Sequence, residues 1–88
     1  MVISQSAFVI WRPAKDGKIH WLGYEWSEDG DCYFDSKDFK SAKIFLDKAE
    51  VEEELEHQKK YGTLAEIIKM GYEEQDNWWR IKEFKIEF

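Results

Sequence analysis

Two Asp-Gly pairs constrain the fold of this chain more than any other feature of its sequence. Asp16-Gly17 and Asp29-Gly30 each lie between runs of aromatic and β-branched residues. An Asp-Gly pair in that setting is the strongest local signal for a two-residue β-hairpin turn, because both residues tolerate the positive φ angles of such turns. The sequence therefore predicts an N-terminal meander of three antiparallel strands, at about residues 6–14, 18–27 and 31–36.

Two-residue turns would set the register of this meander, because the residues flanking each turn must pair. Trp11 would then pair with Leu22, and Tyr24 with Asp35. One side of the sheet, which we expect to face the core, collects Phe8, Ile10, Ile19, Trp21, Cys32 and Phe34. The other side collects aromatics that carry a polar group: Trp11, Tyr24, Trp26 and Tyr33. Residues of these types are enriched where a surface meets a partner, so this side is either covered by the rest of the chain or is a binding face.

The second half of the chain contains one clear helix. Asp47 and Glu50 form a capping-box pattern, and Gly62 suits the position after the last helical turn. A helix over residues 48–61 follows, with a narrow apolar stripe around Val51 and Leu55 on an otherwise acidic surface. The apolar run SAKIFL just before it, residues 41–46, is typical of a short strand.

The segments after this helix are less clear. Thr63 and Glu66 could cap a short helix that ends at Gly71, or Ile67 to Glu73 could form a strand, and we slightly favour the strand. The last residues, WWRIKEFKIEF, predict a closing strand with a β-bulge near Lys82, and Phe88 is expected to be packed. We therefore predict one α+β domain over residues 1–88: an antiparallel sheet of five or six strands with one main helix packed on it.

Composition limits the class of protein. An 88-residue chain is the size of one domain and buries roughly 60 to 65% of its unfolded surface. Cys32 is the only cysteine, which excludes an internal disulfide and suits a reducing compartment. The start of the chain lacks the basic and apolar regions of a signal peptide, and no apolar run is long enough to cross a bilayer. We expect a cytoplasmic protein with no membrane partner.

The candidate chemical sites fail on spacing or on register. Asp29, Asp31 and Asp35 resemble a calcium loop, but the fifth and sixth positions are Tyr33 and Phe34, so no metal is expected. Cys32 and His20 would point to opposite sides of the sheet, which argues against a nucleophile and base pair. The carboxylates lack an isolated apolar setting and a glycine-rich phosphate loop, so we expect neither an enzyme nor a cofactor.

Acidic residues are the most distinctive surface feature. The chain has 19 acids against 13 bases, a net charge of −6, which argues against a direct nucleic-acid partner. An aromatic sheet face could stack bases only if the neighbouring acids faced away from it. The acids of the second hairpin, which we take as the candidate binding surface together with the four aromatics above, are Glu25, Glu28, Asp29, Asp31, Asp35 and Asp38. A row of carboxylates can imitate a phosphate backbone and occupy the basic groove of a nucleic-acid-binding protein.

A compact meander, the segment AKIFLDKAEVEEEL and the closing WWRIKEF together resemble the small acidic accessory proteins of bacteriophages and mobile elements, which include anti-CRISPR proteins and other host inhibitors. The resemblance implies a non-enzymatic inhibitor that binds a host protein and masks its basic surface in the cytoplasm of the host cell. The alternative is a small structural or assembly protein that forms a homodimer or a larger assembly through the aromatic face of its sheet.

Overall fold

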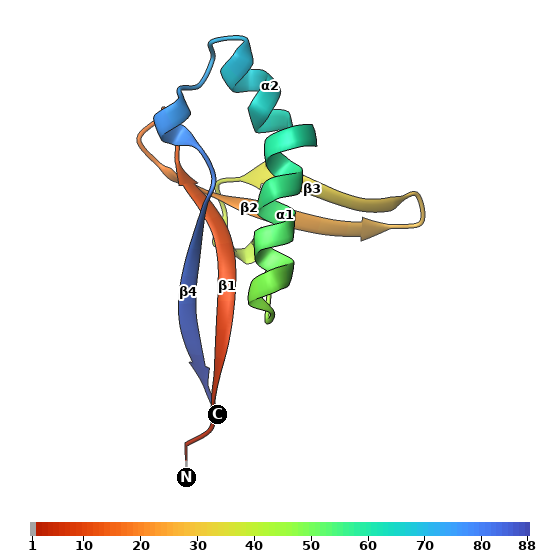
Figure 1. The fold of residues 1–88 in the computed structure, drawn as a ribbon, viewed down its shortest axis with the longest axis vertical. Coiled ribbons are helices and arrows are strands. Elements are labelled where there is room, and N and C mark those ends of the chain that lie inside the picture. Colours follow the sequence, from red (N-terminus) through yellow and green to blue (C-terminus); the bar gives the residue numbers. More distant parts are fainter. Residues whose placement is uncertain (1) are drawn as a thin grey trace.

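Within residues 2–88, four antiparallel strands form one sheet in the order β3-β2-β1-β4, and two α-helices accompany it (Figure 1). This computed structural model describes residues 2–88. The strands are β1 (Ser4–Pro13), β2 (Ile19–Ser27), β3 (Gly30–Ser36) and β4 (Arg80–Glu87). The helices are α1 (Lys48–Tyr61) and α2 (Thr63–Lys69), with short 3-10 turns η1 (Phe39–Ser41) and η2 (Gln75–Asn77). The α+β class is confirmed, but the sheet has four strands rather than five or six, and a second helix is present.

The apolar segment predicted as a strand at 41–46 has a different role. β1 and β2 pair only at Trp11–Pro13 and Ile19–Trp21, and beyond this contact the β1–β4 and β2–β3 pairs diverge (Figure 1). The segment reaches both pairs through single bridges, Gly23 with Ala42 and Phe8 with Phe45. The Phe8 and Phe45 amides and carbonyls exchange two hydrogen bonds of 2.8 Å. These residues therefore join the diverging strands without forming a strand of their own.

Helix α1 has the predicted bounds. The Asp47 side chain accepts a hydrogen bond of 2.8 Å from the amide of Ala49 and so satisfies one free N–H of the first turn. Gly62 ends the helix, but its φ of −75° is ordinary, so it is not the left-handed residue that the sequence suggested. A Cβ at this position would lie 2.6 Å from the carbonyl oxygen of Gln58, so glycine is needed there for space.

Residues 63–69 form helix α2, so the strand that we slightly favoured is wrong. Leu64 is buried in the core, and Ile68 packs against it. Gly71, with a φ of +86°, lies just beyond the end of this helix. No helix within residues 2–88 has both the length and the apolar character needed to span a membrane.

Both hairpin registers differ from the predicted ones. Trp11 pairs with Trp21 rather than with Leu22, a shift of one residue that turns β2 over relative to β1. Tyr24 pairs with Tyr33 rather than with Asp35, a shift of two residues that keeps the faces of β2 and β3 matched. The predicted division of side chains between the two faces is therefore wrong for β2 and β3 together.

The observed register places the core on a different set of residues. The core face of the sheet holds Phe8, Ile10 and Leu22, and these pack with Phe45, Val51, Leu64 and Trp79. Both helices contribute to this cluster, so both lie on the same side of the sheet. On the opposite, outer face, Ile19 is 51% exposed, and Cys32, expected in the core, is exposed as well.

The closing strand is regular. Residues 80–87 pair with residues 4–11 without interruption, so the predicted bulge near Lys82 is absent. The two apolar sets of this strand lie on opposite faces instead: Ile81 pairs with Ile10 on the core face, and Phe84 pairs with Ala7 on the other. Phe88 is 75% exposed and is not packed as expected.

Candidate functional site

A buried arginine organises one end of the core face. Arg12 is 2% exposed, and its Nη2 atom lies 2.6 Å from Oδ2 of Asp35. Its Nη1 atom lies 3.4 Å from Oε1 of Glu73, and its guanidinium is 5.5 Å from the ring centre of Trp79. A buried cation requires such partners, because burial without them costs several kcal/mol. Arg12 thereby connects β1, β3 and the segment between α2 and β4.

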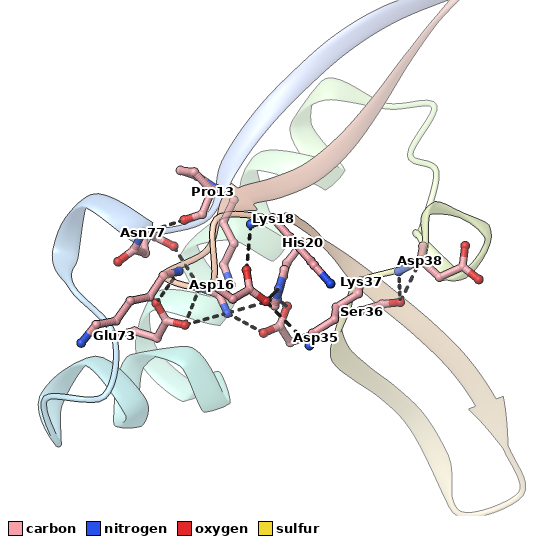
Figure 2. A network of polar contacts seen from close by, with 12 residues as sticks. Pro13, Asp16, Lys18, His20, Asp35, Ser36, Lys37, Asp38, Glu73 and Asn77 are labelled. Carbon is pink, nitrogen blue, oxygen red and sulfur yellow. Dashed lines mark hydrogen bonds and ion pairs between the residues drawn. The ribbon is translucent and has the colours of Figure 1, made fainter.

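His20 extends this cluster toward the first turn (Figure 2). Its Nε2 atom is 2.9 Å from Oδ2 of Asp16, and its Nδ1 atom is 2.9 Å from Oδ1 of Asp35. The Asp16 pKa is lowered to about 2, first because the Lys18 amide donates a 2.8 Å hydrogen bond to its carboxylate and then because of His20. We call Arg12, Asp16, His20, Asp35 and Glu73 the Arg12 network.

The Arg12 network gives one residue of the predicted binding surface, Asp35, a structural role. Asp35 holds Arg12 and His20, so its carboxylate stabilises the fold. The network also explains the first turn: Asp16, expected simply to form the turn with Gly17, instead binds the Lys18 amide and His20, and the loop spans the five residues between Pro13 and Ile19.

A hollow on the surface of about 360 Å³ lies between α1 and the core face of β3. It is lined by Tyr33, Phe45, Glu50, Glu53, Glu54 and His57, and we call it the acidic groove. Residues three and four apart share one face of a helix, so α1 turns Glu50, Glu53, Glu54 and His57 to the same side. Tyr33 and Phe45 supply aromatic walls at the edge of the core.

The two tyrosines at or beside the acidic groove both have raised pKa values. Burial and then the negative charge of Glu54 raise the pKa of Tyr33 to about 12. The neighbouring Tyr24 ring has its centre 5.2 Å from that of Tyr33, and its hydroxyl donates a 2.6 Å hydrogen bond to Asp31, which raises the Tyr24 pKa. The Nζ atom of Lys43 lies 4.4 Å from the centre of the Tyr24 ring. A cation therefore already rests on this aromatic surface.

The structure separates the ten predicted site residues. Tyr24, Tyr33 and Asp31 lie at or beside the acidic groove. Three acids lie toward the far end of the second hairpin, away from the acidic groove: Glu25, Glu28 and Asp29. Trp26 lies there too and is 69% exposed. Asp38 accepts a hydrogen bond from the Lys40 amide and caps η1. Trp11 lies on the outer face, paired with Trp21, so the four predicted aromatics do not share a surface.

The groove residues on α1 were missed as a site. Glu50, Glu53 and Glu54 belong to a long acidic run in the sequence, in which residue type does not distinguish them from Glu52 and Glu56. Their spacing of three and four residues places them on one side of the helix. The facing wall, Tyr33 and Phe45, comes from β3 and from the segment before α1, and no local pattern places these two residues against the helix.

The remaining chemical candidates lie apart from one another. Cys32 pairs with Glu25 and is exposed, whereas His20 is buried on the core face, so the two do not meet. Among residues 2–88, no three His, Cys, Asp or Glu side chains are grouped in a way that could hold a metal ion.

Comparison of the chain with protein-family models, with curated proteins and with solved structures finds no match in any of the three.

Proposed function

We propose that this chain is a non-enzymatic protein-binding inhibitor that masks a basic, nucleic-acid-binding surface of a host protein. The acidic groove is the contact site in this proposal. The observation that supports it is the joint presence of three α1 carboxylates, Glu50, Glu53 and Glu54, and two aromatic side chains in one hollow. Carboxylates attract Lys and Arg, and aromatic rings supply the desolvated contacts that anchor a partner.

The position of Lys43 supports the choice of a basic partner. Its ammonium group lies over Tyr24 at 4.4 Å and over Phe45 at 5.9 Å, within the range of a cation–π interaction. The chain thus places its own cation where a Lys or Arg side chain of a partner would contact the rings. The exposed acids of the hairpin, Glu28 and Asp29 among them, would add long-range attraction.

The proposal is tested with a fluorescent oligo-arginine peptide, which stands in for a basic protein surface, and with single-stranded DNA bound to that peptide. We expect the chain to bind the peptide at low salt, to release the DNA, and to lose affinity as salt is added. The triple variant E50Q/E53Q/E54Q should bind about 3- to 150-fold more weakly, given about 0.2–1 kcal/mol for each ion pair at the surface.

The control carries the same charge change elsewhere. Glu66, Glu83 and Glu87 are exposed and lie outside the acidic groove, so E66Q/E83Q/E87Q should weaken binding by less than about threefold. Equal losses in the two triple variants would show that net charge, and not the groove, attracts the peptide. Asp35 is unsuitable for this test, because its substitution would disturb the Arg12 network.

A further inference from the structure

The outer face of the sheet carries a row of side chains that the predicted register had placed on different faces. The pairing register aligns Arg80 of β4, Trp11 of β1, Trp21 of β2 and Ser36 of β3, one residue from each strand. Trp11 and Trp21 are direct cross-strand neighbours, so their Cβ atoms lie about 4.5–5.5 Å apart. Both indoles therefore lie on one aromatic surface, on the side of the sheet opposite both helices.

This aromatic surface is partly open to solvent. Phe39 of η1 packs edge-on against Trp21, with ring centres 4.8 Å apart, yet Phe39 remains 52% exposed. A hollow of about 210 Å³ in this surface is lined by Trp11, Ile19, Trp21 and Lys82. Its walls are mostly apolar, with a lysine at one side, so it suits a flat aromatic ring that carries a negative group nearby.

The charged strand residues beside the two indoles are positive, unlike the chain as a whole. The Arg80 guanidinium lies 5.7 Å from the centre of the Trp11 ring, and Lys82 lines the hollow. Asp31 and Asp35 lie on the core-face side of β3, and Glu83 pairs with Phe8 on that same side. Among the residues of the four strands, the register leaves one carboxylate on the outer face, that of Glu25 toward the end of the second hairpin.

We propose that the outer face binds a short single-stranded nucleic acid, with bases stacked on Trp11 and Trp21 and phosphates held by Arg80 and Lys82. Aromatic side chains on a sheet with cations beside them are the elements from which sequence-tolerant single-strand sites are built. The net charge of −6 argues against such a ligand only if the acids lie near the aromatics, and the register places most strand acids on the other face. This site is separate from the acidic groove and goes beyond the proposed function.

A second copy of the chain is a poorer occupant of this face. A two-fold contact places the same patch on both subunits, so the patch that carries Arg80 and Lys82 would face an equally positive patch. Like charges brought together at an interface oppose association. The anionic backbone of a nucleic acid carries the complementary charge, and its bases match the indole surface.

The test uses the whole chain at low salt with a labelled oligothymidine of about twelve nucleotides. Binding is followed by anisotropy and by quenching of tryptophan fluorescence. With two phosphate contacts, the logarithm of the binding constant should fall against the logarithm of salt concentration with a slope of about −1.4, and Lys82→Gln should reduce that slope by about 0.7. Trp21→Ala should weaken binding by about fivefold or more, the lower end of what one stacked base contributes. Trp26→Ala is the control, because Trp26 is exposed on the second hairpin away from this row.

Three further ligands and measurements distinguish the outcomes. An abasic oligonucleotide keeps the phosphates without the bases, so binding as tight as that of oligothymidine would overturn the stacking contact. Binding of a polyglutamate peptide with equal affinity would assign the face to an acidic protein instead. Sedimentation that shows association of the chain, lost in Trp21→Ala, without oligonucleotide binding would assign it to a second copy. Lys82→Gln lies on an exposed strand position, so its result does not depend on a change in the core.

Discussion

Replacement of Arg12 by methionine should destabilise the fold more than any other single change in the Arg12 network. Methionine keeps a long apolar stem beside Trp79 but removes the cation that faces Asp35 at 2.6 Å and Glu73 at 3.4 Å. The two carboxylates then lose their partner in unequal surroundings, since the Glu73 side chain is 14% exposed and that of Asp35 is 35% exposed. Glu73 therefore bears the larger desolvation penalty.

The expected size follows from the burial of the arginine. Breaking a buried ion pair by removing one partner costs about 3–5 kcal/mol. A domain of 88 residues has a free energy of unfolding of about 4–13 kcal/mol, so Arg12→Met should remove a large share of it. A second substitution, Glu73→Gln, should return about 1–2 kcal/mol in the Arg12→Met background, because it removes the more buried of the two unpaired charges. In the parent chain the same Glu73→Gln change should be destabilising.

The assay is urea unfolding followed by tryptophan fluorescence, with the change in free energy taken from the shift of the midpoint at constant slope. A thermal scan gives a second measure, at about 4–8 °C per kcal/mol for a domain of this size. A loss below about 1 kcal/mol in Arg12→Met would refute the argument. So would a Glu73→Gln change with the same sign and size in both backgrounds, because the coupling between the two residues would then be absent.

Three other predictions concern single groups. The folded pKa of Asp16 is about 2, against an ordinary value of 3.8, so its contribution to stability is present above pH 3.8 and is lost as pH falls toward 2. Between pH 3.8 and pH 2 the urea midpoint should therefore fall less in Asp16→Asn than in the parent chain. Tyr33, with a pKa near 12, should lose its proton late in a tyrosinate absorbance titration, and Glu54→Gln should lower that pKa toward 10.0 by removing the adjacent charge; an unchanged titration would contradict the contact. Gly62→Ala should destabilise the fold by about 1–3 kcal/mol, because the new Cβ would press on the Gln58 carbonyl oxygen. A gain of about 0.4–1 kcal/mol, which chain entropy would give at a φ of −75°, would show instead that Gln58 moves to make room.

The sequence correctly predicted the ends of helix α1, which depend on contacts between residues close together in the chain. Helix α1 has its predicted ends because Asp47 and Gly62 act through contacts within their own helical turns. Helix α2 has seven residues and no side-chain hydrogen bond at its N-cap, so its sequence alone could not exclude a strand. Leu64 is buried in a core cluster whose members extend from Phe8 to Trp79, so packing between distant parts of the sequence decides the outcome.

The register of the meander shows where pattern analysis failed. The Asp-Gly pairs correctly located both hairpins, but neither turn consists of the two residues of its pair. In the second hairpin Gly30 pairs with Ser27 and takes a φ of +119°, so Glu28 and Asp29 form the turn. In the first hairpin, the contacts of Asp16 with the Lys18 amide and with His20 favour a longer loop. The second of these contacts depends on a buried network that no local pattern reveals.

Whether each register error was an odd or an even number of residues decided which predicted surface residues share a face. A shift of two residues leaves every side chain on its face, whereas a shift of one transfers a whole strand to the other. The first hairpin carries the odd shift, so Trp11 parts from Tyr24 and Tyr33 and joins Trp21. The predicted mixed face of aromatics and acids thereby becomes two surfaces of opposite charge: tyrosines beside carboxylates on the core face, and tryptophans beside cations on the outer face. The two proposed partners, a basic protein and a nucleic acid, are chemically complementary to these two surfaces in turn. Variants of Glu50 and of Lys82 should therefore affect the two binding activities independently.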